Sequence, residues 1–165
     1  MKKLSVLFAA VVMLLSVGVK AQKVASLDVA GILNMMPEKK KADEQLDAYS
    51  KAKQAEILKA GQASQATFQK YQEEAPKQTA EVNKTREAEL QKMQAELQDK
   101  SAAAQKDVQE KTSAAFAPIE DKFNAAVSKV AKANGYDFIF DGNNPSLIYK
   151  SGPDATALVK KELGL

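Results

Sequence analysis

The sequence predicts a mainly α-helical protein in which a long antiparallel helical hairpin, a coiled-coil arm, is inserted into a small strand-based body. Residues 38–134 are rich in Ala, Lys, Glu, Gln and Ser, and most of these residues lose little entropy in a helix. Pro76 lies near the middle of this stretch, where it should divide one helix into two. Alternating apolar patterns occur before and after the stretch, so strands from both ends of the chain should form one body.

Residues 1–21 have the pattern of a secretory signal peptide. Two lysines precede an apolar run over residues 4–17, and Val19-Lys20-Ala21 fits a small-x-small cleavage pattern. We therefore expect export to the periplasm and cleavage after Ala21. An uncleaved membrane anchor is the alternative, but the apolar run is short for a transmembrane helix.

Composition argues against several classes of function. Three of the 24 basic residues lie in the expected signal peptide, which leaves 21 basic and 21 acidic residues in the mature chain. This neutrality gives no basis for binding nucleic acid. The chain has no His, no Cys and no glycine-rich phosphate-binding motif, so the commonest general base, thiol nucleophile and soft metal ligands are missing. We expect no enzyme activity, no cofactor and no bound metal.

The mature chain should begin with a strand over residues 23–29. The apolar side chains of this segment alternate with polar ones and place Leu27 on one face. Residues 31–36 should form a helical turn. Pro37 then suits the first turn of the next helix, where its missing N–H costs nothing.

The arm should comprise residues 38–117, with its tip near residues 75–78. Its apolar side chains are sparse but recur at intervals of three, four and seven residues, as a coiled coil requires. Leu90 and Leu97, for example, are expected on one seam. Because this seam is rich in Ala and poor in Leu and Ile, it should hold the two helices close together but weakly.

A specific register follows if the chain folds back at residues 76–77. Tyr71 then lies opposite Val82, and Ile57 lies opposite Leu97. This register brings many of the larger apolar residues of one helix against apolar or small residues of the other.

Phe68 and Tyr71 are the candidate contact residues of the arm. They lie three positions apart near the tip of an otherwise polar segment. They either pack across the arm and pin the tip, or offer an apolar contact to something bound between arms. Gly61 also has two interpretations, close packing of the helices or a point where the arm bends, since a mid-helix glycine costs about 1 kcal/mol relative to alanine.

The returning helix should lead back to the body. Pro118 is expected to interrupt and kink this helix, and Asn134-Gly135 should end it through a left-handed cap. Asp154 is a good N-cap for a final helix over residues 155–163.

Two strands are expected before the final helix. Residues 136–141 alternate, with Phe138 and Phe140 on one face, and residues 147–150 follow after a turn. The turn at residues 141–144 begins like a calcium-binding loop but lacks the later glutamate. We therefore interpret it as a plain turn.

The body, which we call the head, should consist of residues 22–37 and 118–165. A domain of this size is marginal by itself, and the chain has no cysteine to supply a disulfide. Oligomerisation is therefore expected. The candidate interface residues are Leu27, Phe138 and Phe140, on the predicted strands.

Two stretches of the sequence are distinctive, ILNMMPEKKKADEQL at 32–46 and GYDFIFDGNNPSLIY at 135–149. Through these stretches and the order of its elements, the whole mature chain resembles the Skp/OmpH periplasmic chaperones. This resemblance implies a homotrimer whose strands form a small central barrel. It also implies that the arms enclose a cavity in which unfolded outer-membrane proteins are held without ATP. One departure is the sequence Asp-Ala-Thr at 154–156, where the family often has Asp-Ile-Thr or Asp-Leu-Thr.

Lipopolysaccharide binding and a purely structural role are two other functions of long helical arms. Some family members have basic arm tips suited to lipopolysaccharide, but residues 70–90 hold four basic and five acidic side chains. No lipopolysaccharide or membrane site is therefore carried over to this chain. A structural spacer or surface-adhesion coiled coil is the alternative function. A longer heptad array rich in Leu and Ile would favour that alternative, and this chain lacks one.

Overall fold

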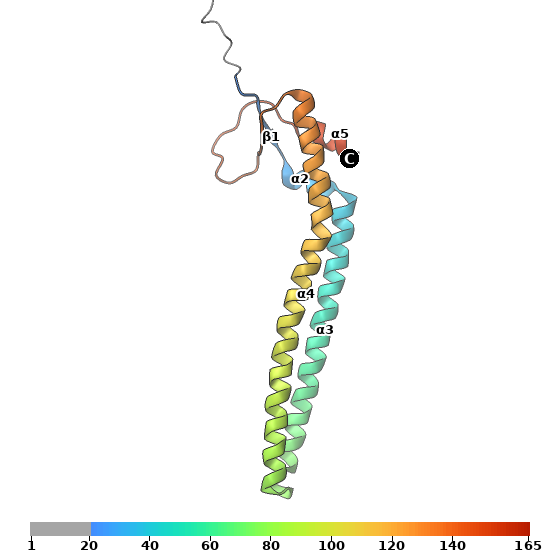
Figure 1. Ribbon diagram of the computed structural model, residues 1–165, viewed down its shortest axis with the longest axis vertical. Helices are drawn as coiled ribbons and strands as arrows, with labels where there is room; N and C mark the ends of the chain where they lie inside the picture. The colour runs from blue at the N-terminus through green and yellow to red at the C-terminus, as the bar shows by residue number, and fades with distance from the viewer. Residues whose placement is uncertain (1–20) are drawn as a thin grey trace, which may run out of the picture.

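The computed structural model describes residues 21–165, so the predicted signal peptide lies almost entirely outside the described residues. A long two-helix arm extends from a small head that contains both ends of the described chain (Figure 1). The elements, in order, are β1 (Val24–Leu27), α2 (Val29–Met35), α3 (Pro37–Glu74), the 3-10 turn η1 (Ala75–Lys77), α4 (Ala80–Asn134), β2 (Phe138–Asp141) and α5 (Thr156–Leu163). This architecture confirms the predicted mainly α fold with a helical hairpin and a small strand-containing body.

The first strand is shorter than the sequence predicts, because a helix begins inside the predicted strand. The side chain of Asp28 accepts a hydrogen bond of 2.8 Å from the backbone N–H of Gly31. This bond caps the N-terminus of α2, and Val29 is helical. Pro37 occupies the first turn of α3, as predicted.

The arm consists of α3 and the first part of α4, which lie side by side in antiparallel directions (Figure 1). The 3-10 turn η1 ends α3, and the chain reverses through Gln78 and Thr79. The hydroxyl of Thr79 accepts a hydrogen bond from the N–H of Val82 and so caps α4.

The returning helix is not interrupted at Pro118, contrary to the prediction. α4 is a single helix of 55 residues with this proline inside it. A proline inside a helix costs about 3 kcal/mol. Ile119 and Phe123 are both buried in the head, and burying each such side chain contributes about 1.5–3 kcal/mol. Packing of the segment that follows the proline therefore outweighs the local penalty, and Gly135 ends the helix in the predicted left-handed conformation.

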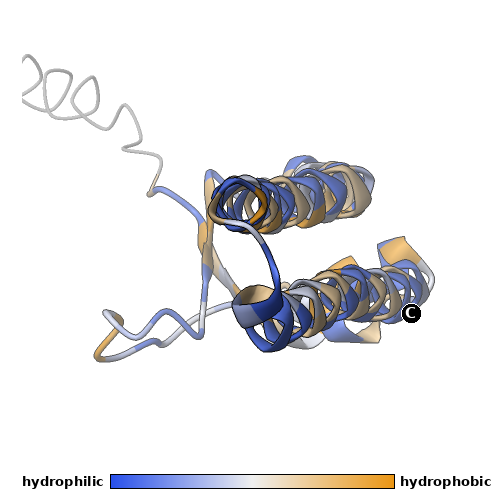
Figure 2. Cartoon of the chain, turned by 90° about the horizontal axis from the view of Figure 1, so that it is seen from below, coloured by the Kyte–Doolittle hydropathy of each residue, from blue (hydrophilic) through white to orange (hydrophobic). Residues whose placement is uncertain are grey.

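The predicted strands at residues 136–141 and 147–150 do not pair with each other as a C-terminal hairpin. β1 and β2 pair in parallel, with Val24 opposite Phe138, so the connection between the two strands is the whole arm. Residues 147–150 form no strand in the described chain. The other edge of β1 is occupied by the segment before α5, because the N–H of Ser26 donates to the carbonyl of Pro153 at 2.9 Å. Residues 142–153 form a loop that extends away from the head (Figures 1 and 2).

The final helix begins one residue later than predicted. Asp154 accepts a hydrogen bond from the N–H of Thr156 at 2.8 Å, but Ala155 occupies the N-cap position and is fully buried. The strand-like contact of residues 153–155 with β1 thus continues directly into α5.

The hydrophobic core lies in the head. Strand β1, the helices α2 and α5, the first turns of α3 and the last turns of α4 all contribute to it. Its buried apolar residues are Ala25, Leu27, Ile32, Met36, Ala42, Ile119, Phe123, Ala126, Val130, Ala155 and Val159. No residue between Ala42 and Ile119 reaches the same degree of burial, so the arm extends from the core without a core of its own.

Candidate functional site

The surfaces of the arm and of the sheet are the features that could bind another molecule. Within residues 21–165, no group of three or more His, Cys, Asp or Glu side chains is placed to hold a metal ion. No helix in the same residues combines the length and apolar character needed to cross a membrane.

A polar cluster joins the two helices in the half of the arm that is nearer the head. The Tyr49 hydroxyl donates a hydrogen bond to Asp107, and the Lys53 ammonium lies 2.9 Å from the same carboxylate. These two donors hold the pKa of Asp107 below its ordinary value, and the hydrogen bond to Asp107 raises the pKa of Tyr49. The ammonium of Lys111 lies 5.6 Å from the centre of the Tyr49 ring. Charged and aromatic groups thus replace an apolar layer at this level of the seam.

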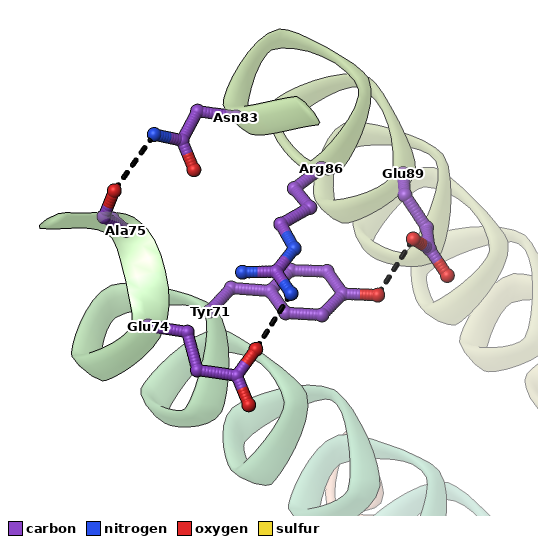
Figure 3. Close-up of polar contacts among 6 residues, drawn as sticks. All are labelled: Tyr71, Glu74, Ala75, Asn83, Arg86 and Glu89. Atoms are coloured by element: carbon purple, nitrogen blue, oxygen red, sulfur yellow. Dashed lines mark hydrogen bonds and ion pairs between the residues drawn. The ribbon is translucent and has the colours of Figure 1, made fainter. Parts of the chain in front are cut away.

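A second polar cluster, the tip clasp, closes the end of the arm (Figure 3). The Arg86 guanidinium lies 4.4 Å from the centre of the Tyr71 ring, and its Nη2 donates to Glu74 at 2.6 Å. The Tyr71 hydroxyl donates to Glu89 at 2.7 Å, which raises the pKa of Tyr71. The clasp consists of Tyr71, Glu74, Asn83, Arg86 and Glu89, in which Asn83 donates to the carbonyl of Ala75 at 3.0 Å.

The two candidate aromatic residues therefore have different environments. Tyr71 is half-buried and belongs to the tip clasp, which matches the interpretation that it pins the tip. Phe68, one turn earlier, keeps 51% of its surface exposed. Of the predicted pair, Phe68 is the residue whose side chain is open to a binding partner.

The side-chain contacts between the two helices differ from the predicted register by about one to two helical turns. Tyr71, predicted opposite Val82, reaches Glu89. Leu97, predicted opposite Ile57, lies beside Gly61. Side chains lean toward the N-terminus of their own helix, so those of α3 lean toward the head and those of α4 lean toward the tip. As a result, a residue of α3 contacts a residue of α4 that lies further from the tip than the α4 residue at its own height.

Gly61 is not required by close packing of the helices. A Cβ atom added at this position would lie 3.8 Å from Cδ2 of Leu97, which is ordinary van der Waals contact. Of the two interpretations for this glycine, close helix packing is therefore not supported by its surroundings.

Two grooves of contrasting charge follow the seam of the arm. The charged groove, of ≈ 560 Å³, includes Lys53, Glu56, Lys59, Lys100 and Asp107 among its lining residues. The neutral groove, of ≈ 400 Å³, lies nearer the tip and is lined by Gly61, Ser64, Gln65, Phe68, Leu90, Gln91, Gln94 and Leu97. None of the residues that line the neutral groove is charged. Viewed along the arm, hydrophilic residues are interspersed with hydrophobic ones along both helices (Figure 2).

The candidate interface residues of the head lie on two sides of the sheet. Leu27 is buried in the core of the chain itself, so it supports the sheet from within. Phe138 is 57% exposed and pairs with Val24, which is also exposed. Phe140, two residues further along β2, points to the same side as Phe138 and is half-buried. The outer face of the sheet is therefore apolar and exposed at Val24 and Phe138, whereas Phe140 is half-buried and its neighbour Ser26 is buried.

The most exposed apolar residues that the sequence pattern did not single out lie on α3 and on the loop before α5. Leu58 on α3 is 63% exposed, and Ile148 and Tyr149 project from the loop between β2 and α5. The two loop residues lie in the segment predicted as a strand, where alternation would have placed one of them inward. Leu58 follows the seam residue Ile57 directly, and this adjacency could have marked it as pointing outward.

Comparisons with known proteins agree with this architecture. The family model described as outer membrane protein (OmpH-like) matches residues 23–163. A crystal structure of an OmpH-like protein from Caulobacter crescentus, described as a candidate outer membrane chaperone, superposes with a TM-score of 0.72 and 17% sequence identity. The match covers 88% of this chain and 86% of that chain. At this identity the likeness shows the fold alone. A search of curated proteins finds no significant match.

Proposed function

The chain belongs to the OmpH-like family, and on this premise we propose that it is an ATP-independent periplasmic chaperone. Its clients are unfolded outer-membrane proteins, which it holds in a cavity between arms and keeps from aggregating. The similar protein from Caulobacter crescentus, itself described as a candidate outer membrane chaperone, supports this proposal. The chain acts by binding alone, without catalysis or a cofactor.

The observation that carries the proposal is an arm that is long but has no core. α3 has 38 residues, and a few large apolar side chains of the arm, such as Leu58 and Phe68, are exposed. Single apolar contacts are weak, but several contacts to one unfolded chain add to a high apparent affinity. Such an arm can enclose a client without presenting one large adhesive patch.

We propose that the functional form is a homotrimer assembled through the heads. The exposed side of the sheet, with Val24 and Phe138, supports this assembly because a small head gains stability by covering an apolar face. A trimer would place three arms around one space, which multiplies the contacts available to a client.

Aggregation of an unfolded outer-membrane β-barrel protein, followed by light scattering, tests the proposal. The mature chain should suppress aggregation equally well with and without ATP. A shortened arm that lacks residues 54–67 and 93–106 should lose most of this protection. Each deletion removes about four helical turns. Because the two deletions have equal length, the residues of the Lys53–Asp107 contact still face each other, and so do those of the tip clasp.

The shortened chain also distinguishes the alternative function. Its head should stay folded and keep the oligomeric mass of the full chain. If the shortened chain protects the client as well as the full chain does, the arms are spacers and the cavity mechanism is wrong.

A further inference from the structure

The α3 wall of the neutral groove continues as an uncharged stripe toward the head. Leu58, Gly61, Gln65 and Phe68 are three, four and three residues apart, a spacing that places them on one side of a helix. Ala60 lines the charged groove and Gly61 lines the neutral groove. Successive residues point about 100° apart, so the two grooves open in different directions.

The α4 wall of the neutral groove presents side-chain amides. Gln91 and Gln94 line the groove opposite Gln65, and all three side chains are exposed. A glutamine amide offers both hydrogen-bond donors and an acceptor, which are the groups that pair with the N–H and C=O of a peptide backbone. Charged residues make up 27% of the chain, yet none lines this groove.

The two large apolar residues of the stripe have a spacing that suits an extended chain. Leu58 and Phe68 are separated by ten helical positions, or about 15 Å along the helix axis. In an extended strand, residues four positions apart on one face are separated by about 13 Å. One face of an extended segment can therefore contact both Leu58 and Phe68, with the glutamine amides beside its backbone.

We propose that the neutral groove binds an extended, uncharged segment of an unfolded polypeptide in which apolar residues alternate with polar ones. Two apolar side chains four positions apart rest on Leu58 and Phe68. This inference rests on the proposed function and specifies the kind of client segment that the arm selects. It explains why the groove lacks charge, because a charged side chain beside an apolar segment would lose hydration without gaining a partner.

The first test compares two short fluorescent peptides by anisotropy with the mature chain. The two peptides have the same uncharged composition. In one the apolar residues alternate, and in the other no two apolar residues are two or four positions apart. The alternating peptide should bind about tenfold more tightly, because only this peptide can cover both anchors. Equal affinity of the two peptides would overturn the proposal.

The second test places charge in the neutral groove. The double variant Gln65→Glu/Gln94→Glu should bind the alternating peptide about tenfold more weakly than the unmodified chain. The matched control is Gln105→Glu/Gln109→Glu, which makes the same two changes at exposed positions of α4 beside the Lys53–Asp107 contact, on the head side of Leu58 and outside the described grooves. The control should bind like the unmodified chain, and equal weakening in both variants would contradict the proposal.

Two further measurements separate this inference from the proposed function and from self-association. If the unmodified chain fails to protect any unfolded client, the proposed function is wrong. If it protects but Gln65→Glu/Gln94→Glu protects equally well at every concentration, only the neutral-groove proposal is wrong. A change in oligomeric mass for this variant and not for the control would identify the groove as a contact between copies of the chain, which also overturns the proposal.

Discussion

The head and the arm share the helices α3 and α4 but are stabilised in different ways. In the head, α4 buries Ile119, Phe123 and Val130 among residues of other elements. In the arm, the same helix packs against α3 and the tip turn η1, and its seam residues such as Leu97 are half-buried. Burial, more than helix formation, therefore divides this chain into a stable part and an adaptable part.

Polar clusters partly replace the missing core of the arm. The contacts around Asp107 and the tip clasp around Arg86 cross the seam at two levels. Both ion pairs remain partly in contact with solvent, and pairs at a protein surface contribute about 0–1 kcal/mol each. They set the register of the arm more than its stability, and they leave the apolar groups between them available for binding.

The largest effect should come from a core substitution that breaks the head. Phe123→Ala should destabilise the chain by about 3–5 kcal/mol, because it leaves a cavity among buried residues. Leu97→Ala on the same helix should cost less than about 2 kcal/mol, since its side chain is only half-buried. Urea unfolding followed by circular dichroism measures both. Equal losses would mean that the arm is as tightly packed as the head.

The next effect should fall on assembly. Phe138→Asp should dissociate the proposed oligomer, because an unpaired charge on a covered sheet face costs several kcal/mol. It should hardly change the fold of the subunit, since Phe138 is exposed in the single chain. Ala157→Asp on the exposed side of α5 is the matched control. Mass from light scattering is the measurement, and a Phe138→Asp chain of undiminished mass would place the assembly contacts elsewhere.

The smallest effect should be local to the tip of the arm. Arg86→Ala removes the ion pair with Glu74 and the stacking on Tyr71, which should loosen the tip by about 1 kcal/mol. Amide hydrogen exchange should accelerate in the tip and remain unchanged in the head. Arg86→Lys should show a partial effect, because it keeps the charge but loses the planar stacking group. Faster exchange in the head as well would show that tip and head are coupled.

The structure of the loop after β2 shows where sequence patterns stop being informative. Residues 147–150 have a strand pattern, but a strand also needs an edge to pair with. Residues 153–155 pair with the edge of β1 opposite β2, so residues 142–152 serve as the connection from β2 to the far side of β1 and do not fold back along β2. The pairing of segments far apart in the sequence decided this outcome, and no local pattern contains it.

The sequence also predicted only part of the candidate site. The position of Phe68 and Tyr71 near the tip follows from helix length and Pro76 alone. Their separate environments depend on the lean of side chains across the seam, which brings Arg86 onto Tyr71 and leaves Phe68 open. A pattern of spacing within one helix cannot show which residue of the other helix arrives opposite it.

By itself, the sequence determined the features that arise from local chemistry. Helix-forming composition produced the two long helices, Pro76 marked the reversal, and Pro37 and Gly135 marked a helix start and a helix end. Only the tertiary structure decided the parallel pairing of the strands, the continuity of α4 through Pro118 and the register of the arm. These features depend on contacts between distant segments, where the free energy of packing exceeds the local preference of any single residue.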